Sequence, residues 1–211
     1  MGAAKTATRK AKLTRAEKVE ANRDALIQAA VEVIGEEGYF NASIQKITQR
    51  AGLGLGTFYR HFETQQELFD LLLPVKGAEL LDHLQKAATG ATDFVEVELR
   101  GMEAFFRWAR KNPWFFRLLH EAHVAAPVAY KRHIENIAER YRRSLLRSWE
   151  KGELPAFEKA ELETLTYLLI SMRDYVFAEY VERSEDSDDS ISDVIETYRK
   201  LITFGLKRGP A

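Results

Sequence analysis

The chain has 211 residues, of which 45% are apolar and 30% are charged, and its formal net charge is −1. These proportions are typical of a globular protein with a buried core, and the lack of cysteine excludes disulfides, thiolate metal sites and a cysteine nucleophile. No apolar run approaches the roughly 18 residues of a membrane span, and the basic N-terminus lacks the apolar core of a secretory signal. We therefore expect a cytoplasmic protein.

A basic segment precedes the first helical pattern. Residues 1–22 carry more lysine and arginine than glutamate, and residues 1–13 show no hydrophobic periodicity, so we expect a partly disordered arm. Such a cationic arm could also bind DNA phosphates. Thr14 and Glu17 have the spacing of a helix-capping box. Apolar residues then recur at helical spacing over residues 26–34, and two glycines follow them, which predicts the first helix.

Residues 43–69 indicate a helix-turn-helix, a motif whose second helix lies in the DNA major groove. Gly52 suits the tight turn between the two short helices, because a glycine adds no bulk there. With Phe58 and Phe62 facing inward, the second helix presents hydroxyl and cationic side chains outward, as contacts to phosphates require. These outward positions are Leu55, Gly56, Thr57, Tyr59, Arg60 and His61. Glycine turns between short helices also occur in proteins that bind no DNA, so the motif leaves both interpretations open.

The remainder of the chain is helical in pattern as well. Thr64 and Glu67 begin a fourth helix, which Pro74 interrupts and which can resume beyond it as a connector. Further helical patterns follow, separated mainly by prolines and glycines, and we find no convincing strand and no internal repeat. The sequence therefore predicts an all-α fold of about nine helices. Its expected parts are the arm (1–22), a three-helix helix-turn-helix DNA-binding domain (23–73) and a helical ligand-binding and dimerisation domain (74–211).

The helix-turn-helix segment resembles one known family. Residues 47–69, with Ala51-Gly52, GTFYRHF at residues 56–62 and Glu67-Leu68-Phe69, resemble the DNA-binding domain of the TetR/AcrR family of bacterial transcriptional repressors. Residues 27–39 are similar to the first helix of that family. The resemblance covers roughly residues 23–73. It implies a homodimer that binds a palindromic operator, and a C-terminal ligand whose binding spreads the two recognition helices and releases the DNA.

The resemblance also assigns roles to single residues. Matched by position, the phosphate contacts are Ser43, Thr57, Tyr59 and His61, and the residues that face bases are Gln45, Leu55 and Gly56.

Two positions depart from the family. Gln65 replaces a lysine that contacts phosphate, and Gly54-Leu55 replaces a polar pair such as Ser-Lys. We expect these departures to weaken operator binding unless the basic arm compensates. The alternative is a dimeric helical protein that binds a partner or a small molecule and has lost DNA binding.

An aromatic cluster marks the C-terminal part of the chain. Aromatic residues at helical spacing more often form a packed core, yet rings crowded around Pro113 also favour an apolar cavity between helices. We expect a small hydrophobic or aromatic effector, with fatty acids and acyl thioesters as candidates. The expected ligand-binding residues are Phe105, Trp108, Phe116, His120, Tyr167, Met172 and Tyr175.

Several charged residues leave the chemistry of this part open. Arg117 or Arg173 could pair with a ligand carboxylate, although we favour contacts with solvent or with neighbours such as Glu121 and Asp174. His120 and His123 share a helix face, but the spacing supplies no further metal ligands, so we expect no metal and no cofactor. No nucleophile–base pattern and no phosphate-binding glycine loop is present, and we expect no enzyme activity.

Two apolar stripes near the C-terminus predict the dimer interface. Paired with the same stripes of a second subunit, they would form a four-helix bundle. One stripe could instead cover the core of its own subunit. The expected interface residues are Leu165, Leu169, Ile195, Tyr198 and Ile202.

Overall fold

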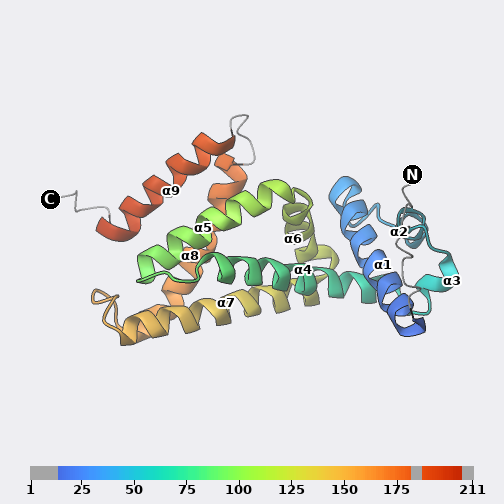
Figure 1. Cartoon of the computed structure of the whole chain (residues 1–211), viewed down its shortest axis with the longest axis horizontal. Coiled ribbons are helices and arrows are strands. Elements are labelled where there is room, and N and C mark those ends of the chain that lie inside the picture. Colours follow the sequence, from blue (N-terminus) through green and yellow to red (C-terminus); the bar gives the residue numbers. More distant parts are fainter. Residues whose placement is uncertain (1–13, 182–186, 206–211) are drawn as a thin grey trace, which may run out of the picture.

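The computed structural model describes residues 14–181 and 187–205, and within these ranges all regular structure is helical (Figure 1). This confirms the all-α prediction of about nine helices. Residues 1–13 of the predicted arm lie outside the described residues. The helices are α1 (Arg15–Glu37), α2 (Ile44–Ala51), α3 (Leu55–Phe58), α4 (Gln65–Ala87), α5 (Phe94–Lys111), α6 (Trp114–Ala125), α7 (Pro127–Glu150), α8 (Leu162–Val176) and α9 (Ser187–Phe204), with short η1 (Lys159–Glu161) and η2 (Phe177–Val181).

The first helix begins earlier than the expected boundary of the DNA-binding domain. The Thr14 hydroxyl accepts from the Glu17 N–H at 3.2 Å, and the Glu17 carboxylate accepts from the Thr14 N–H at 2.7 Å. This capping box supplies acceptors for the first N–H groups of α1, which otherwise have no intrahelical partner. The part of the predicted arm from Arg15 onward is therefore helical.

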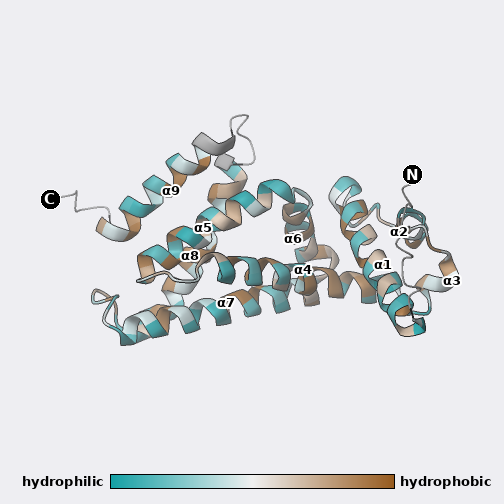
Figure 2. Ribbon diagram, viewed as in Figure 1, coloured by the Kyte–Doolittle hydropathy of each residue, from teal (hydrophilic) through white to brown (hydrophobic). Residues whose placement is uncertain are grey.

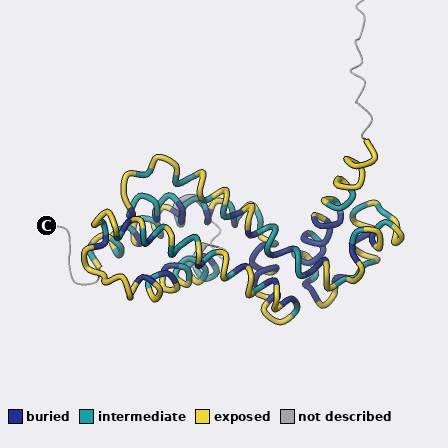
Figure 3. The backbone as a smooth tube through the Cα atoms, turned by 90° about the horizontal axis from the view of Figure 1, so that it is seen from below, coloured by how far each residue is buried: buried dark blue, intermediate teal, exposed yellow. Residues whose placement is uncertain are grey.

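The N-terminal helices enclose a small apolar core. The inner face of α1 packs on α2, and the aromatic rings that follow α2 close the core from the other side. Phe58 is fully buried and Phe62 is almost so, as their inward orientation requires. Figure 3 shows this core as a compact buried patch beside the exposed start of α1.

Helix α4 connects the two parts of the molecule. It continues through Pro74 as one helix of 23 residues, where the sequence pattern suggested an interruption. Figure 1 shows α4 running from α1–α3 into the C-terminal helices, where it packs along α7 and α5. One rigid element therefore belongs to both parts.

The aromatic cluster of the C-terminal part forms a packed core. Phe116 stacks on Phe177 with ring centroids 4.4 Å apart, and Phe105 meets both rings edge-on. Such offset and edge-to-face pairs add to the apolar burial of the rings. These phenylalanines therefore form a packed core, which is one of the two interpretations of the aromatic cluster, and not the wall of an apolar cavity. Figure 2 shows apolar and polar residues alternating along α5 and α7, and both helices pack on α4.

Candidate DNA-binding face and effector cavity

A left-handed glycine turns the chain between α2 and α3. Gly52 has φ 67° and ψ 28°, a conformation that side chains with a Cβ rarely adopt. The Leu53 N–H donates to the Thr48 carbonyl at 2.9 Å across this turn. At the other end of α2, the Ser43 hydroxyl accepts from the Lys46 N–H at 3.3 Å and caps the helix. These contacts fix α2 and α3 as a helix-turn-helix.

The predicted DNA-contacting residues gather on one face around α3. Leu55 and Tyr59 are 51% and 58% exposed, although both are large and apolar or aromatic. Arg60 folds back over the same helix, where its Nη2 donates to the Thr57 hydroxyl at 2.9 Å. Gly56 and Gln45 are exposed as well, while His61 and Ser43 are half-buried. The face thus presents an apolar side chain, hydroxyls and a cation together.

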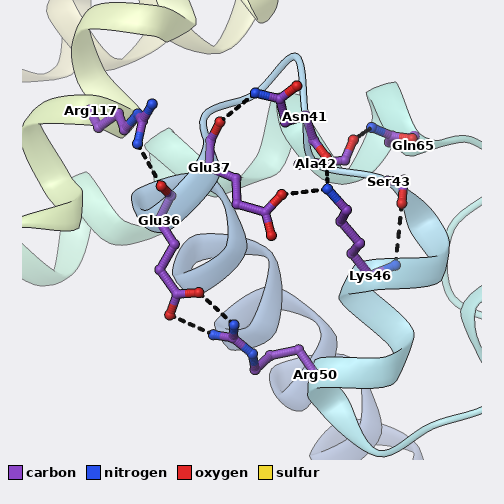
Figure 4. A network of polar contacts seen from close by, with 9 residues as sticks. All are labelled: Glu36, Glu37, Asn41, Ala42, Ser43, Lys46, Arg50, Gln65 and Arg117. Atoms are coloured by element: carbon purple, nitrogen blue, oxygen red, sulfur yellow. Dashed lines mark hydrogen bonds and ion pairs between the residues drawn. The ribbon is translucent and has the colours of Figure 1, made fainter.

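Gln65, one of the two departures from the TetR pattern, has a structural contact. Its side-chain amide donates to the Ala42 carbonyl at 2.7 Å, which ties the start of α4 to the loop before α2 (Figure 4). In the same region the two cations of α2 pair with carboxylates of α1. Lys46 pairs with Glu37, and Arg50 makes two hydrogen bonds to Glu36 at 2.6 and 2.9 Å. These cations stabilise the domain and are partly neutralised.

Helix α6 contacts the C-terminal end of α1. The Glu121 carboxylate accepts from the Tyr39 N–H at 2.7 Å. Figure 4 shows the second contact, in which Arg117 donates to the Glu36 carbonyl at 2.8 Å. Arg117 also pairs with Glu121 at 2.9 Å, as one of the two sequence interpretations expected. At Gly35 a Cβ would lie 2.4 Å from the Trp114 Cβ, so glycine is required for this close approach.

The C-terminal part contains a cavity of about 680 Å³ among α4, α5, α7 and α8, within the range of roughly 300–1,000 Å³ that is common for small-molecule sites. Leucine, valine, isoleucine and alanine side chains line it together with polar groups. The lining residues are Leu81, Leu84, Gln85, Ala88, Thr89, Val97, Glu98, Gly101, Ile137, Arg140, Tyr141, Arg143, Ser144, Arg147 and Arg173.

None of the seven predicted ligand-binding residues lines this cavity. Phe105 and Phe116 are buried in the aromatic core, and Met172 is half-buried against it. Trp108 lines an open groove on α5, and His120 lies 3.5 Å from Asp174.

The two predicted tyrosines of α8 also miss the cavity. Tyr167 and Tyr175 are 44% and 69% exposed. The predicted ligand-binding residues and the cavity therefore lie apart, because several of the predicted aromatic side chains are packed in the core.

A buried polar network forms one wall of the cavity. Glu98 is only 4% exposed, and its Oε2 accepts from Tyr141 and Tyr198 hydroxyls at 3.1 Å each and from Arg173 Nη2 at 3.2 Å. Burial raises the pKa of both tyrosines, and the neighbouring carboxylate adds to the effect. Burial alone would lower the pKa of Arg173, but Tyr141 and Glu98 outweigh it and raise that pKa. The network connects α5, α7, α8 and α9. It consists of the Glu98–Arg173 ion pair and the two tyrosine hydroxyls that donate to Glu98.

Sequence reasoning missed this network, although one signal was present. Glu98 lies in the row Phe94–Glu98–Met102, four residues apart on a helix face that is otherwise buried and apolar. A charged residue in such a row requires a buried partner. The partner is Arg173, for which the sequence suggests only solvent, Asp174 or a ligand.

The residues of the predicted dimer stripes pack at least partly against the core of their own subunit, which was the alternative that the sequence left open. Leu169 and Tyr198 are buried inside the subunit, and Leu165, Ile195 and Ile202 pack partly against the same core. The reason is that both faces of α8 are apolar, and the inner one carries the predicted stripe. Its exposed apolar residues are Tyr167, Leu168 and Tyr175.

The two histidines of α6 have separate neighbours. His120 is near Asp174, whereas the His123 ring meets the Tyr130 ring edge-on at 5.0 Å. Within the described residues no group of three or more histidine or carboxylate side chains is arranged to hold a metal ion.

Among the described residues, no helix is both long and apolar enough to span a membrane.

Comparison with known proteins agrees with this geometry. Residues 26–72 match the family described as "Bacterial regulatory proteins, tetR family". The transcriptional activator FasR of Mycolicibacterium smegmatis is 30% identical over 99 residues, which are 47% of this chain and 45% of that protein. The chain therefore matches less than half the length of this curated relative.

Two solved structures share the fold over almost the whole chain. The fatty acid degradation regulator FadR of Bacillus halodurans superposes with a TM-score of 0.76 at 20% identity, covering 94% of this chain and 100% of that one. FadR of Bacillus subtilis, solved in complex with stearoyl-CoA, gives a TM-score of 0.74 at 17% identity, covering 87% and 98%. The relatives are transcriptional regulators and not enzymes. Residues 26–72, which contain the helix-turn-helix, therefore match the tetR family of bacterial regulatory proteins, and the remainder of the chain shares the fold of the two FadR structures.

Proposed function

We propose that this protein is a ligand-responsive transcriptional regulator, acting as a repressor. It binds a palindromic operator as a homodimer in the cytoplasm, and a small hydrophobic effector in the cavity among α4, α5, α7 and α8 releases it.

One observation carries the proposal: α4 contacts both the helix-turn-helix and the cavity. At its start, Gln65 bonds the loop before α2, and near its end Leu81, Leu84 and Gln85 line the cavity. A shift of α4 caused by an occupant of the cavity would therefore move the recognition face. The contact of Glu121 with the Tyr39 N–H provides a second connection between the same two parts.

We propose an acyl thioester as the effector class. The cavity has apolar walls, and four of its lining side chains are arginines. These features suit an apolar chain with an anionic head group. The Bacillus subtilis FadR structure holds stearoyl-CoA in the same fold, which makes stearoyl-CoA the first compound to test.

For the homodimer we propose the outer face of α8. Tyr167, Leu168 and Tyr175 form an exposed apolar strip there, and apolar side chains in such a strip lose contact with water when two copies pair. Leu165, Ile195 and Ile202 from the predicted stripes are only partly buried and remain proposed interface residues.

The test is binding to DNA from upstream of the gene, over a range of salt concentrations. We expect tight binding, with a logarithm of the association constant that falls linearly with the logarithm of the salt concentration. Addition of stearoyl-CoA should abolish binding. Arg60→Gln should weaken binding and reduce the salt slope by about one unit. Arg132→Gln, which removes another exposed arginine from the distant α7, is the matched control and should change neither.

The alternative function, a helical binding protein without DNA affinity, has one observation in its favour. Lys46 and Arg50 of α2 are already paired with carboxylates of α1, which reduces the charge available for phosphates. Absence of DNA binding at low salt would favour this alternative and exclude the repressor.

A further inference from the structure

Arg173 holds hydrogen-bonding capacity that the protein does not use. The guanidinium has five N–H donors, and its one hydrogen bond among the described residues runs from Nη2 to Glu98. Its Nε is buried without an acceptor. Arg173 lines the cavity, and its side chain is only 12% exposed. Nε is closed off from the cavity, so an acceptor on the occupant would meet the Nη donors that Glu98 leaves unused.

The charge balance at Arg173 selects the kind of acceptor. Glu98 already neutralises the guanidinium, and it is itself buried. A ligand carboxylate beside this pair would bring a second negative charge into a buried site, which is unfavourable without a further cation. A neutral carbonyl oxygen accepts the same N–H bond and adds no charge.

The anionic end of the ligand has a different partner. Arg140 is paired with Asp82 at 3.0 Å, and Arg143 is paired with Glu139 at 3.5 Å. Arg147 also lines the cavity, is exposed, and makes no ion pair within residues 14–181 and 187–205. A phosphate or similar anion at the exposed side of the cavity would thus meet an available guanidinium.

We propose that Arg173 donates a hydrogen bond to a neutral carbonyl of the effector, while Arg147 forms an ion pair with its anionic group. The ligand class is therefore an acyl thioester of an anionic carrier, with a carbonyl between head group and tail, and not a free fatty acid. This inference rests on the proposed effector site. Within that site, Arg173 is the residue that favours ligands with a carbonyl.

Gly101 keeps the approach to Arg173 open. It lines the cavity beside the guanidinium, and a Cβ at this position would lie 3.6 Å from Arg173 Nη2 and 4.0 Å from Nη1, an ordinary van der Waals distance. Gly101→Ala would therefore cover the guanidinium without disturbing its pair with Glu98. Alanine also favours the helical conformation of α5 over glycine, so this variant should fold.

The experiment compares two ligands that differ by one carbonyl, measured by titration calorimetry on the full chain. Stearoyl-CoA is a thioester, and S-octadecyl-CoA is the thioether in which a methylene replaces the carbonyl. We expect the wild type to bind stearoyl-CoA about tenfold more tightly, as one hydrogen bond to a charged donor allows. Gly101→Ala should bring the two affinities together without lowering the melting temperature. Arg147→Gln should weaken both ligands by the same factor.

Equal affinities in the wild type, or a preference that survives in Gly101→Ala, would overturn the role of Arg173. Failure of both ligands to bind would overturn it as well, because the proposed class would be wrong. Release of operator DNA, measured on the same preparations, tests the proposed function separately. If the wild type prefers the ligand with the carbonyl but neither ligand releases DNA, the role of Arg173 is supported and the proposed function as a ligand-responsive regulator is contradicted.

Discussion

The part of the chain before Pro74, which is the DNA-binding half of the proposed regulator, and the part with the cavity, which is its effector half, bury different kinds of side chain. In the described part before Pro74, the buried polar residue Thr48 satisfies its hydroxyl within its own helix, at 2.9 Å from the Ile44 carbonyl. The effector half instead buries a carboxylate, a guanidinium and His133. Periodic apolar patterns are enough to specify the first interior, whereas the second depends on partners that meet only in the folded chain.

This difference has a functional meaning. A core of apolar residues holds the recognition face rigid, which base and phosphate contacts require. A buried charged pair next to a cavity offers directional contacts to a ligand, at an energetic cost that only complete pairing offsets.

The largest effect is expected at Glu98. Glu98→Ala leaves the buried guanidinium of Arg173 unpaired and two tyrosine hydroxyls without their acceptor. The free energy of unfolding should fall by about 3–5 kcal/mol, measured by urea denaturation. Thr48→Ala in the DNA-binding half removes a locally satisfied hydroxyl and should cost only about 1 kcal/mol.

A double variant separates charge from packing in this prediction. Glu98→Leu with Arg173→Met replaces both charges by apolar side chains and should recover much of the lost stability, because no buried ion remains unpaired. If Glu98→Ala lowered the free energy of unfolding no more than Thr48→Ala does, the two interiors would not differ in how strongly their buried polar groups stabilise the fold.

Gly35→Ala tests the contact between the halves. The added Cβ would lie 2.4 Å from the Trp114 Cβ and 3.1 Å from its Cα, so backbone must move. We expect a loss of up to about 3 kcal/mol, the usual cost of overpacking, and a weaker release of operator DNA by the effector. Gly101→Ala, where a Cβ meets ordinary van der Waals contacts, is the control and should lose no stability. Unchanged stability and release in Gly35→Ala would mean that α1 and α6 are not coupled.

His133 should make the effector half sensitive to acid. Burial against Gly77 and Phe115 lowers the pKa of His133 to about 4. The unfolded state, with a pKa near about 6.5, takes up a proton first as the pH falls. Stability is therefore complete above that value and is lost between about pH 6.5 and 4, by about 2 kcal/mol from pH 7 to pH 5.

Denaturation at several pH values measures this term. His133→Gln cannot titrate, so it should show a smaller decrease in stability over the same range, whatever its stability at neutral pH. Identical slopes for the variant and the wild type would contradict a neutral buried imidazole.

The sequence predicted the helix-turn-helix well because its determinants are local. The left-handed turn at Gly52, the Ser43 cap and the inward rings of Phe58 and Phe62 depend on neighbours a few residues away. The capping box at Thr14 was also recognised, although the helix it begins extends into the predicted arm.

The cavity that we propose as the effector site could not be predicted in the same way. Its polar wall joins Glu98, Tyr141, Arg173 and Tyr198, up to 100 positions apart, and no spacing rule relates them. The two faces of α8 illustrate the same difficulty. Both are apolar, so periodicity identifies the helix without telling which face covers the core.

The smallest effect concerns Gln65, where two properties should change in opposite directions. Gln65→Lys removes the 2.7 Å bond to the Ala42 carbonyl, which should cost about 1 kcal/mol of unfolding free energy. The same substitution restores the cation that the TetR pattern has at this position, so operator affinity should rise, with a salt slope steeper by about one unit. Gln66→Lys adds the same charge one position along, at a more exposed side chain. It loses only the weaker 3.2 Å contact with Ala125 and a contact with Asp70, and should increase affinity less. Loss of stability without a gain in affinity would show that Gln65 serves the fold alone, and that the operator is bound without a phosphate contact from the start of α4.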